Sequence, residues 1–364
     1  MKRLFAGMTA ALLAVVLAFS FPVRAISAQS AVLMDCTTGR ILYSKQMDKK
    51  SLIASTTKIM TALIVCEQCN VLDCMKIPKE AVGIEGSSMY LKEGEVLTIQ
   101  ELLYGLMLHS GNDAAVALAI YCGGTVAGFV QLMNDKAHSL GLTNTHFENP
   151  NGLDAENHYS TAEDLASLAS YAMNNPIFSK IVSTKTVKAG ARYLRNHNKL
   201  LWQLEGVDGV KTGFTKAAGR ILVSSAKRQG RRLVAVTIAD PNDWKDHISL
   251  LETGFSKYSE CLIISQGKVL GYVEIAGGVS DRVELIAKEQ FSYSLSQNEK
   301  PEIYLPPAGF VYAPVAEGQS AGFAQVYLND QWIGMVPLVY GQTVEQQITT
   351  KPKFWKQIIG GNDT

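Results

Sequence analysis

The sequence predicts an α+β fold in two parts: an antiparallel sheet flanked by helices, followed by a small all-β domain. Between residues 52 and 172 apolar residues recur mainly at helical spacing, whereas residues 206–240 and those beyond 263 form runs typical of strands. The chain has 364 residues, which is enough for two domains. A first part that runs strand, helices, strands, helix is typical of one sheet with helices packed on its faces.

The first 28 residues have the composition of a secretory signal peptide. Lys2 and Arg3 precede a mostly apolar run from Leu4 to Phe21, and small residues follow up to Ala25 and Ala28, where cleavage is expected. An uncleaved membrane anchor is the alternative, because the apolar run is close to spanning length. Both alternatives predict an extracytoplasmic protein, either secreted or held at the outer face of the cytoplasmic membrane.

Net charge gives no sign of a nucleic-acid partner. The formal charge is +1, and cleavage after residue 25 would remove three basic residues and no acidic one, leaving −2. Proteins that bind nucleic acid usually carry a strongly basic surface. We therefore expect no nucleic acid among the partners.

The domain that follows the signal, residues 29–262, opens with a hairpin and a helix. Residues 31–50 read as two strands around a turn at Thr38 and Gly39. The apolar run after Ser55 has helical spacing, so a helix is expected to begin there.

Two further helices are expected on either side of a break at residues 109–113, HSGND. Thr98 and Glu101 have the spacing of a capping box at the start of the first helix. Gly123 and Gly124 are expected to end the second helix, because glycine is common just past a helix end.

The rest of this domain is predicted to contain helices and then strands. A helix is expected at about 126–140, and the turn-rich segment ENPNGLDAENHYST must be a loop. Ser160 and Glu163 resemble a second capping box. Residues 206–240 read as adjacent antiparallel strands, and a last helix follows them.

Residues 263–345 contain only short strands and turns, which predicts the small β-domain. Asn329-Asp330, between two apolar runs, is a hairpin signal. The tail, residues 346–364, is basic and aromatic, which favours contact with a membrane surface; a frayed terminus is the alternative.

Six cysteines in an exported chain permit disulfides but are too few for a disulfide scaffold. Three of them lie in the segment CEQCNVLDC, which raises the question of a metal site. No histidine lies near it and no fourth ligand is evident, which favours buried thiols or one local disulfide. We expect no metal and no cofactor.

A serine and a lysine at the predicted start of the first helix suggest catalysis. Ser55 and Lys58 are three residues apart and therefore face the same side of a helix. A serine is a weak nucleophile until a base removes its proton. Burial, the helix N-terminus and a second cation would all lower the pKa of Lys58 and leave its amine neutral. The alternative is a capping serine beside a lysine that extends to solvent.

Two later segments could complete such a site. Ser110 and Asn112, in HSGND, supply a hydroxyl and an amide at the break between two helices. Lys211, Thr212 and Gly213 lie on a predicted strand, where the two side chains suit a substrate carboxylate and the glycine permits close approach. Lys211 is also the second cation that would lower the pKa of Lys58.

Ser-x-x-Lys, Ser-x-Asn and Lys-Thr-Gly occur here in the order found in the serine penicillin-recognising enzymes. The chain resembles most the low-molecular-mass penicillin-binding proteins, the serine-type D-alanyl-D-alanine carboxypeptidases. The resemblance covers about residues 29–340 and includes ASTTKIMTA, LLYGLMLHSGNDAA, GVDGVKTGFTKAAG and VYLNDQWIGMVPL. It implies a penicillin-binding/β-lactamase-like transpeptidase domain followed by the β-domain.

The resemblance also implies a reaction. Ser55 would attack the carbonyl between the last two D-alanines of a peptidoglycan stem pentapeptide, with Lys58 as general base. D-Alanine would leave with a proton from Ser110 or Lys58, and water would hydrolyse the acyl-enzyme. The backbone N–H groups of Ser55 and Phe214 would form the oxyanion hole.

Substrate-binding roles follow from the same resemblance. Asn112 would bind the substrate backbone, and Lys211 and Thr212 would hold the terminal carboxylate beside Gly213. β-Lactams would acylate Ser55 because they mimic the same dipeptide.

The chain departs from some relatives at two positions. Phe214 stands where some carry a histidine after Lys-Thr-Gly, and no arginine lies in ADPNDWKDH, where Lys245 is a weak substitute. These changes bear on substrate preference and rate.

Three other functions are alternatives to this reading of the motifs. A β-lactamase would need a carboxylate to activate the deacylating water, and Glu148 is the nearest acid, in a segment that does not match the β-lactamase loop. A penicillin-binding scaffold with little turnover, in a specialised wall such as a spore cortex, is a second alternative. An exported adhesion-type protein is the third, and the ordered motifs disfavour it.

Overall fold

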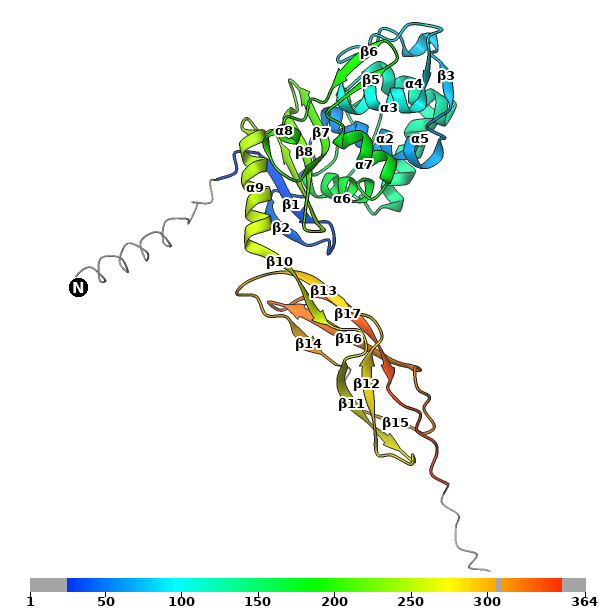
Figure 1. The fold of residues 1–364 in the computed structure, drawn as a ribbon, viewed down its shortest axis with the longest axis vertical. Coiled ribbons are helices and arrows are strands. Elements are labelled where there is room, and N and C mark those ends of the chain that lie inside the picture. Colours follow the sequence, from blue (N-terminus) through cyan, green and yellow to red (C-terminus); the bar gives the residue numbers. More distant parts are fainter. Residues whose placement is uncertain (1–24, 306–308, 349–364) are drawn as a thin grey trace, which may run out of the picture. The chain divides into compact units, whose positions relative to one another are not determined.

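The computed structural model describes residues 25–305 and 309–348. Most of the predicted signal peptide, and the tail from residue 349 onward, lie outside the described residues. The chain forms two compact units, Met1–Ser256 and Lys257–Thr364, each with its own core (Figure 1).

A five-stranded antiparallel sheet forms the centre of the first unit, with the order β2-β1-β9-β8-β7. Its strands are β1 (Ser30–Asp35), β2 (Ile41–Lys45), β7 (Val207–Thr215), β8 (Gly219–Arg228) and β9 (Arg231–Ile238). The predicted β1–β2 hairpin is confirmed, and Gly39 provides a positive φ of 71° at its turn. Because the order ends at β7, one side of that strand pairs with no other strand among the described residues.

Helices cover both faces of this sheet (Figure 1). Val32 and Val236 point into the large apolar core shared with the main group of helices, whereas Leu33 and Ala235 point into a smaller core with the last helix, α9. Burial on both faces explains why the strands read as nearly continuous apolar runs. The helices are α2 (Lys58–Gln68), α3 (Ile99–Leu108), α4 (Asn112–Gly123), α5 (Val126–Ser139), α6 (Ala162–Ala172), α7 (Pro176–Ser183), α8 (Leu200–Gln203) and α9 (Asp243–Lys257), with short 3₁₀ turns η1 (Ala54–Thr57) and η2 (Lys79–Ala81).

Helix starts were predicted with mixed success. The capping box of Thr98 and Glu101 on α3 is present in full. The predicted box on α6 is wrong by one residue: Thr161 is the N-cap and accepts a hydrogen bond from the backbone N–H of Asp164 at 3.1 Å. Ser160 is still extended, because its backbone pairs with that of Ser51.

Two small two-stranded sheets in the first unit were not predicted from the sequence. They pair β3 (Cys74–Lys76) with β4 (Val96–Thr98), and β5 (Thr186–Ala189) with β6 (Arg192–Arg195). Strands of three or four residues are too short to show a clear alternation of polar and apolar positions.

The second unit is all-β, as predicted. Strand β10 (Tyr258–Ile264) pairs with β13 (Phe291–Ser296), so the unit begins before residue 263. Asn329 and Asp330 both have positive φ and form the predicted tight turn. The other strands form one sheet in the order β14-β16-β17-β12-β11-β15: β11 (Val269–Ala276), β12 (Arg282–Ala287), β14 (Glu302–Tyr304), β15 (Phe310–Tyr312), β16 (Ser320–Leu328) and β17 (Gln331–Tyr340).

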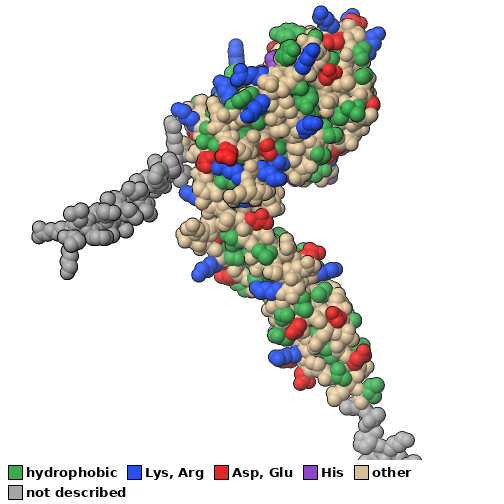
Figure 2. All heavy atoms as spheres, in the orientation of Figure 1, with side chains coloured by type: hydrophobic (Ala, Val, Ile, Leu, Met, Phe, Trp, Pro, Cys, Tyr) green, Lys and Arg blue, Asp and Glu red, His purple; other side chains and the backbone are tan. Residues whose placement is uncertain are grey.

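All six cysteines are free thiols, and those of Cys69 and Cys122 are hydrogen-bonded neighbours. Within residues 25–305 and 309–348 no group of three His, Cys, Asp or Glu side chains is arranged to hold a metal ion. Among the same residues no single helix has both the length and the hydropathy to cross a membrane, although α4 and α5, bent by 83°, meet that test as a pair. On the face drawn in Figure 2, basic and acidic side chains are interspersed over both units.

Candidate active site

Ser55 and Lys58 lie at the junction of η1 and α2, on the face of the sheet that packs against the larger apolar core. Ser55 is half-buried in the 3₁₀ turn, and Lys58, the first residue of α2, is fully buried. The Nζ atom of Lys58 lies 3.0 Å from Oγ of Ser55 and 2.7 Å from Oδ1 of Asn112, and it also contacts the backbone carbonyl of Asn151. All three partners are neutral, so none of them balances a positive charge on the amine.

This environment lowers the pKa of Lys58 well below its ordinary value. Burial is the largest cause, and the positive charge of Lys211 is the second. The nearby carboxylate of Asp113 opposes the shift only in part. A neutral amine at 3.0 Å from a hydroxyl can accept its proton.

Strand β7 lies directly against the turn that carries the serine. A Cβ atom placed on Gly213 would meet both the carbonyl oxygen of Ile53 and the backbone nitrogen of Ser55 at 3.3 Å. The backbone of β7 at Gly213 therefore packs closely against η1, and an added side chain there would press on the turn that carries Ser55. The next residue, Phe214, has a side chain that is 65% exposed.

Ser110 and Asn112 occupy the break between α3 and α4. Ser110 is buried and has a φ of 63°, and its hydroxyl forms no hydrogen bond with another residue that the structure describes. Asn112 is held on both sides of its amide: Oδ1 accepts from Lys58, and Nδ2 donates to the carbonyl of Glu85 at 2.5 Å. The amide of Asn112 therefore orients the lysine.

Lys211 and Thr212 lie on β7, just before Gly213. The Nζ atom of Lys211 is buried and donates to the carbonyl oxygen of Thr212 at 2.8 Å. Burial lowers the pKa of Lys211 to about 7. Thr212 is half-buried, so its side chain is within reach of a ligand on β7.

The loop before α6 contributes groups that sequence reasoning missed. The carbonyl of Asn151 accepts from Lys58, and the side chain of Asn149 accepts from the backbone N–H groups of Asn151 and Gly152. Gly152 has a φ of 86°, and a Cβ there would lie 1.9 Å from the carbonyl oxygen of Ala54. The Asn-Gly pair predicts a turn. The sequence does not show that a backbone carbonyl of this turn contacts the lysine, because every residue has such a carbonyl.

His158 connects the same loop to η1 through hydrogen bonds of both ring nitrogens. Its Nδ1 accepts from the backbone N–H of Glu148 at 3.1 Å, which makes Nε2–H the donor to Oγ1 of Thr57 at 2.7 Å. Thr57 in turn donates to the carbonyl of Ala54 at 2.8 Å. Burial lowers the pKa of His158 to about 4, in keeping with a neutral ring.

Asp113 was also missed, although it immediately follows Asn112. Its buried carboxylate accepts from the hydroxyl of Ser88 at 2.7 Å and from the backbone N–H groups of Met89 and Leu91 at 2.9 and 3.1 Å. These hydrogen bonds hold residues 87–91 against the start of α4.

Neither of the two weak sequence candidates joins the site. The carboxylate of Glu148 accepts from the backbone N–H of Asn157 at 2.9 Å, within its own loop. Lys245 is exposed on α9, which packs against the opposite face of the sheet from α2.

Comparisons with known proteins agree with this arrangement. Residues 17–242 match the family model described as D-alanyl-D-alanine carboxypeptidase, peptidase family S11. The chain belongs to this family. Residues 258–346 match a second family, the C-terminal domain of penicillin-binding protein 5.

Individual relatives of this carboxypeptidase match over most of its length. The D-alanyl-D-alanine carboxypeptidase DacF of Bacillus subtilis is 34% identical over 81% of this chain and 80% of its own. DacD of Escherichia coli is 35% identical, and the match covers 88% of this chain and 87% of DacD. The crystal structure of penicillin-binding protein 5 from Haemophilus influenzae superposes with a TM-score of 0.76 at 31% identity, covering 88% of this chain and 98% of that one.

Proposed function

We propose that this serine D-alanyl-D-alanine carboxypeptidase removes the terminal D-alanine from peptidoglycan stem pentapeptides through an acyl-enzyme on Ser55. The observation that carries the proposal is the contact between the hydroxyl of Ser55 and the buried amine of Lys58 at 3.0 Å. The family match supports the substrate class.

Acylation begins when Oγ of Ser55 attacks the carbonyl of the penultimate D-alanine and Lys58 takes the serine proton. The carbonyl oxygen acquires negative charge beside the backbone N–H groups of Ser55 and Phe214. Gly213 brings those two segments together, since its Cα hydrogen faces the backbone of Ile53 and Ser55.

The C–N bond then breaks, and the departing D-alanine receives a proton from Lys58 or Ser110. The terminal carboxylate of the substrate is held by Lys211 and Thr212 on β7. Asn112 positions Lys58, and it binds the backbone of the substrate peptide. Water finally hydrolyses the ester on Ser55 and restores the free enzyme.

β-Lactam acylation tests this proposal. The protein and a Ser55→Ala variant are incubated with benzylpenicillin, and intact mass is followed over hours. We expect one long-lived adduct on the parent only, together with release of D-alanine from a D-Ala-D-Ala peptide. A short-lived adduct with hydrolysis of the drug would indicate a β-lactamase, and an adduct without peptide turnover would indicate a penicillin-binding scaffold.

The location proposed for this enzyme is the extracytoplasmic side of the cell membrane, where peptidoglycan lies. Contact of residues 346–364 with the membrane surface is part of the same proposal. Co-sedimentation of the protein with anionic vesicles tests it, and loss of binding after deletion of residues 349–364 is the expected result. Unchanged binding would exclude the tail as the contact.

A further inference from the structure

Two cysteine thiols meet at the ends of two helices that also carry residues of the candidate active site. Cys69 is the C-cap of α2, and Cys122 lies in the last turn of α4. Their side chains are hydrogen-bonded to each other. No step of the proposed reaction uses this pair, so its presence needs another explanation.

Two further contacts hold the last turn of α4 against the end of α2. The Sγ atom of Cys122 lies 3.7 Å from Oε1 of Gln68, the last residue of α2. The hydroxyl of the neighbouring Tyr121 donates to the carboxylate of Asp73 at 2.9 Å. The packing of two segments that are 53 residues apart in the chain therefore keeps the two thiols together.

The helices α2 and α4 are in contact and run in the same direction (Figure 1). Their first residues are joined by the hydrogen bond from Nζ of Lys58 to Oδ1 of Asn112 at 2.7 Å, and their last turns by the two thiols. At 1.5 Å per residue, the 11 residues of α2 place the thiols about 16 Å from the start of that helix. A covalent bond between the thiols would fix both helices without touching the reacting groups.

The two thiols differ in acidity. Their hydrogen bond is the largest cause of a lowered pKa at Cys69 and of a raised pKa at Cys122. Both side chains are half-buried, so a small reagent can reach them from solvent. A thiolate is the attacking species in disulfide exchange, and a neighbouring thiol completes the exchange. Cys69 has the character of the first and Cys122 that of the second.

The other cysteines are less suited to pair with Cys69. Cys66 precedes it by three residues, but its side chain is 7% exposed in the larger core, and burial raises its pKa to about 12. Burial likewise raises the pKa of Cys36 to about 11. Cys74 is exposed on β3, and Cys261 lies on β10 of the second unit. These positions favour a bridge to α4 over a local disulfide within CEQCNVLDC.

We propose that Cys69 and Cys122 are a site of disulfide formation, with a low-molecular-mass disulfide as the oxidant. Disulfides persist outside the cytoplasm, which is the location proposed for this protein. The thiolate of Cys69 attacks one sulfur of the oxidant, which forms a mixed disulfide and releases one thiolate. The thiol of Cys122 then loses its proton to solvent and attacks Sγ of Cys69, which releases the second thiolate. Two protein thiols are oxidised, and one disulfide is reduced to two thiols.

The experiment counts thiols after oxidation. The reduced protein is freed of reductant and incubated with glutathione disulfide at pH 8. The remaining thiols are then alkylated with N-ethylmaleimide in denaturant and counted by intact mass. The parent should lose two of its six thiols, and peptide mapping should find Cys69 bonded to Cys122.

Serine variants identify the partners. Cys69→Ser and Cys122→Ser should each keep all their remaining thiols under the same treatment. Cys74→Ser is the matched control, because Cys74 lies in the same segment and is exposed, and this variant should lose two thiols as the parent does.

Thermal unfolding gives a second readout. A bridge between these residues closes a long loop, so the oxidised parent and the oxidised Cys74→Ser variant should unfold about 5–10 °C higher than their reduced forms. Cys122→Ser should show no such difference, and in its reduced form it should unfold close to the reduced parent.

Three outcomes would overturn the inference: no loss of thiols in the parent, a mapped bridge that joins other cysteines, or an equal loss in Cys122→Ser. The peptide map of the parent decides the pairing even if a variant fails to fold. None of these readouts measures peptidase activity. The inference can therefore fail while the proposed function stands, and it can hold if that function fails.

Discussion

The Nζ atom of Lys58 lies 3.0 Å from Oγ of Ser55, and its other hydrogen-bond partners are the neutral side chain of Asn112 and the neutral backbone of Asn151. Such surroundings lower the pKa of a lysine, because a buried charge without a counter-ion is costly. In the proposed function, this position at the start of a buried helix places the base next to the nucleophile.

Replacing Lys58 by arginine should therefore abolish the base while keeping a cationic side chain. Arginine stays protonated in proteins and cannot accept the serine proton. We expect acylation by benzylpenicillin to slow by about 10²–10⁴-fold, the usual contribution of general base catalysis. The second-order rate constant, measured by intact mass, checks this. Acylation of the Lys58→Arg protein at the parent rate would rule out the role.

The pH dependence of acylation should report the ionisation of Lys58. The pKa of this lysine is lowered, so the reactive neutral form predominates once the pH exceeds that value, and the rate should rise with pH up to a plateau. Lys211→Gln removes the second cause of the shift, so the pKa of Lys58 should rise and the ascending limb move to higher pH. Lys211 itself has a pKa of about 7, which confines its influence to lower pH values.

The measurement is the pH profile of the acylation rate for both proteins. A limb at the same pH in the parent and the Lys211→Gln variant would mean that the charge of Lys211 does not act on Lys58.

Gly152→Ala should damage the site through the backbone. Its Cβ would lie 1.9 Å from the carbonyl oxygen of Ala54, next to Ser55, and its φ of 86° disfavours any side chain. Gly141→Ala is the matched control, since Gly141 has a φ of 70° but nothing within 4 Å of the added atom. We expect the control to lose about 1–2 kcal/mol of stability, the cost of a left-handed backbone alone.

The Gly152 variant should lose more stability than the control and at least tenfold in acylation rate. Thermal unfolding and benzylpenicillin acylation measure the two effects. Equal behaviour of the two variants would show that the loop and η1 are not in contact in solution.

Stability should fall in acid partly because His158 is buried in its neutral form. Its folded pKa of about 4 is below the ordinary 6.5, so the native state binds fewer protons than the unfolded chain between these values. The contribution is complete above pH 6.5, is lost as the pH falls toward 4, and amounts to about 3 kcal/mol. His247, whose pKa burial lowers to about 3, acts in the same direction.

Urea unfolding at several pH values between 7 and 4 measures this loss. His158→Gln should be less stable at pH 7 and show a shallower decline, whereas exposed His138→Gln should follow the parent. A decline of the same steepness in the His158 variant would assign the acid sensitivity to other groups.

The sequence alone determined the fold class, the order of the main elements and the pairing of Ser55 with Lys58. Helical and strand periodicities are local, and residues three apart on a helix are neighbours whatever surrounds them. The same locality predicted the box at Thr98 correctly and the one at Ser160 wrongly, because the backbone of Ser160 pairs with Ser51, more than 100 residues earlier.

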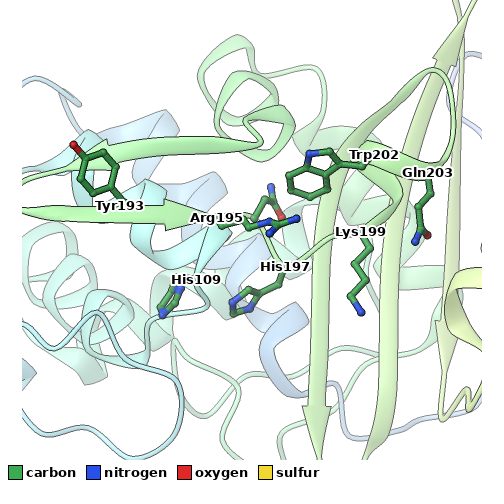
Figure 3. Close-up of a pocket in the computed structure, with 8 residues that line it drawn as sticks. His109, Tyr193, Arg195, His197, Lys199, Trp202 and Gln203 are labelled. Carbon is green, nitrogen blue, oxygen red and sulfur yellow. The ribbon is translucent and has the colours of Figure 1, made fainter.

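Only the tertiary structure decided what surrounds the lysine. Asn112 was expected to bind the substrate, and the structure adds that its amide accepts from Lys58 and donates to the carbonyl of Glu85. The contact of Lys58 with the carbonyl of Asn151 was not expected. The pocket drawn in Figure 3 likewise combines a residue just after α3 with others from β6, from α8 and from the segment between them. Contacts between distant segments depend on how the whole chain packs, so they cannot be predicted from a local pattern of residues.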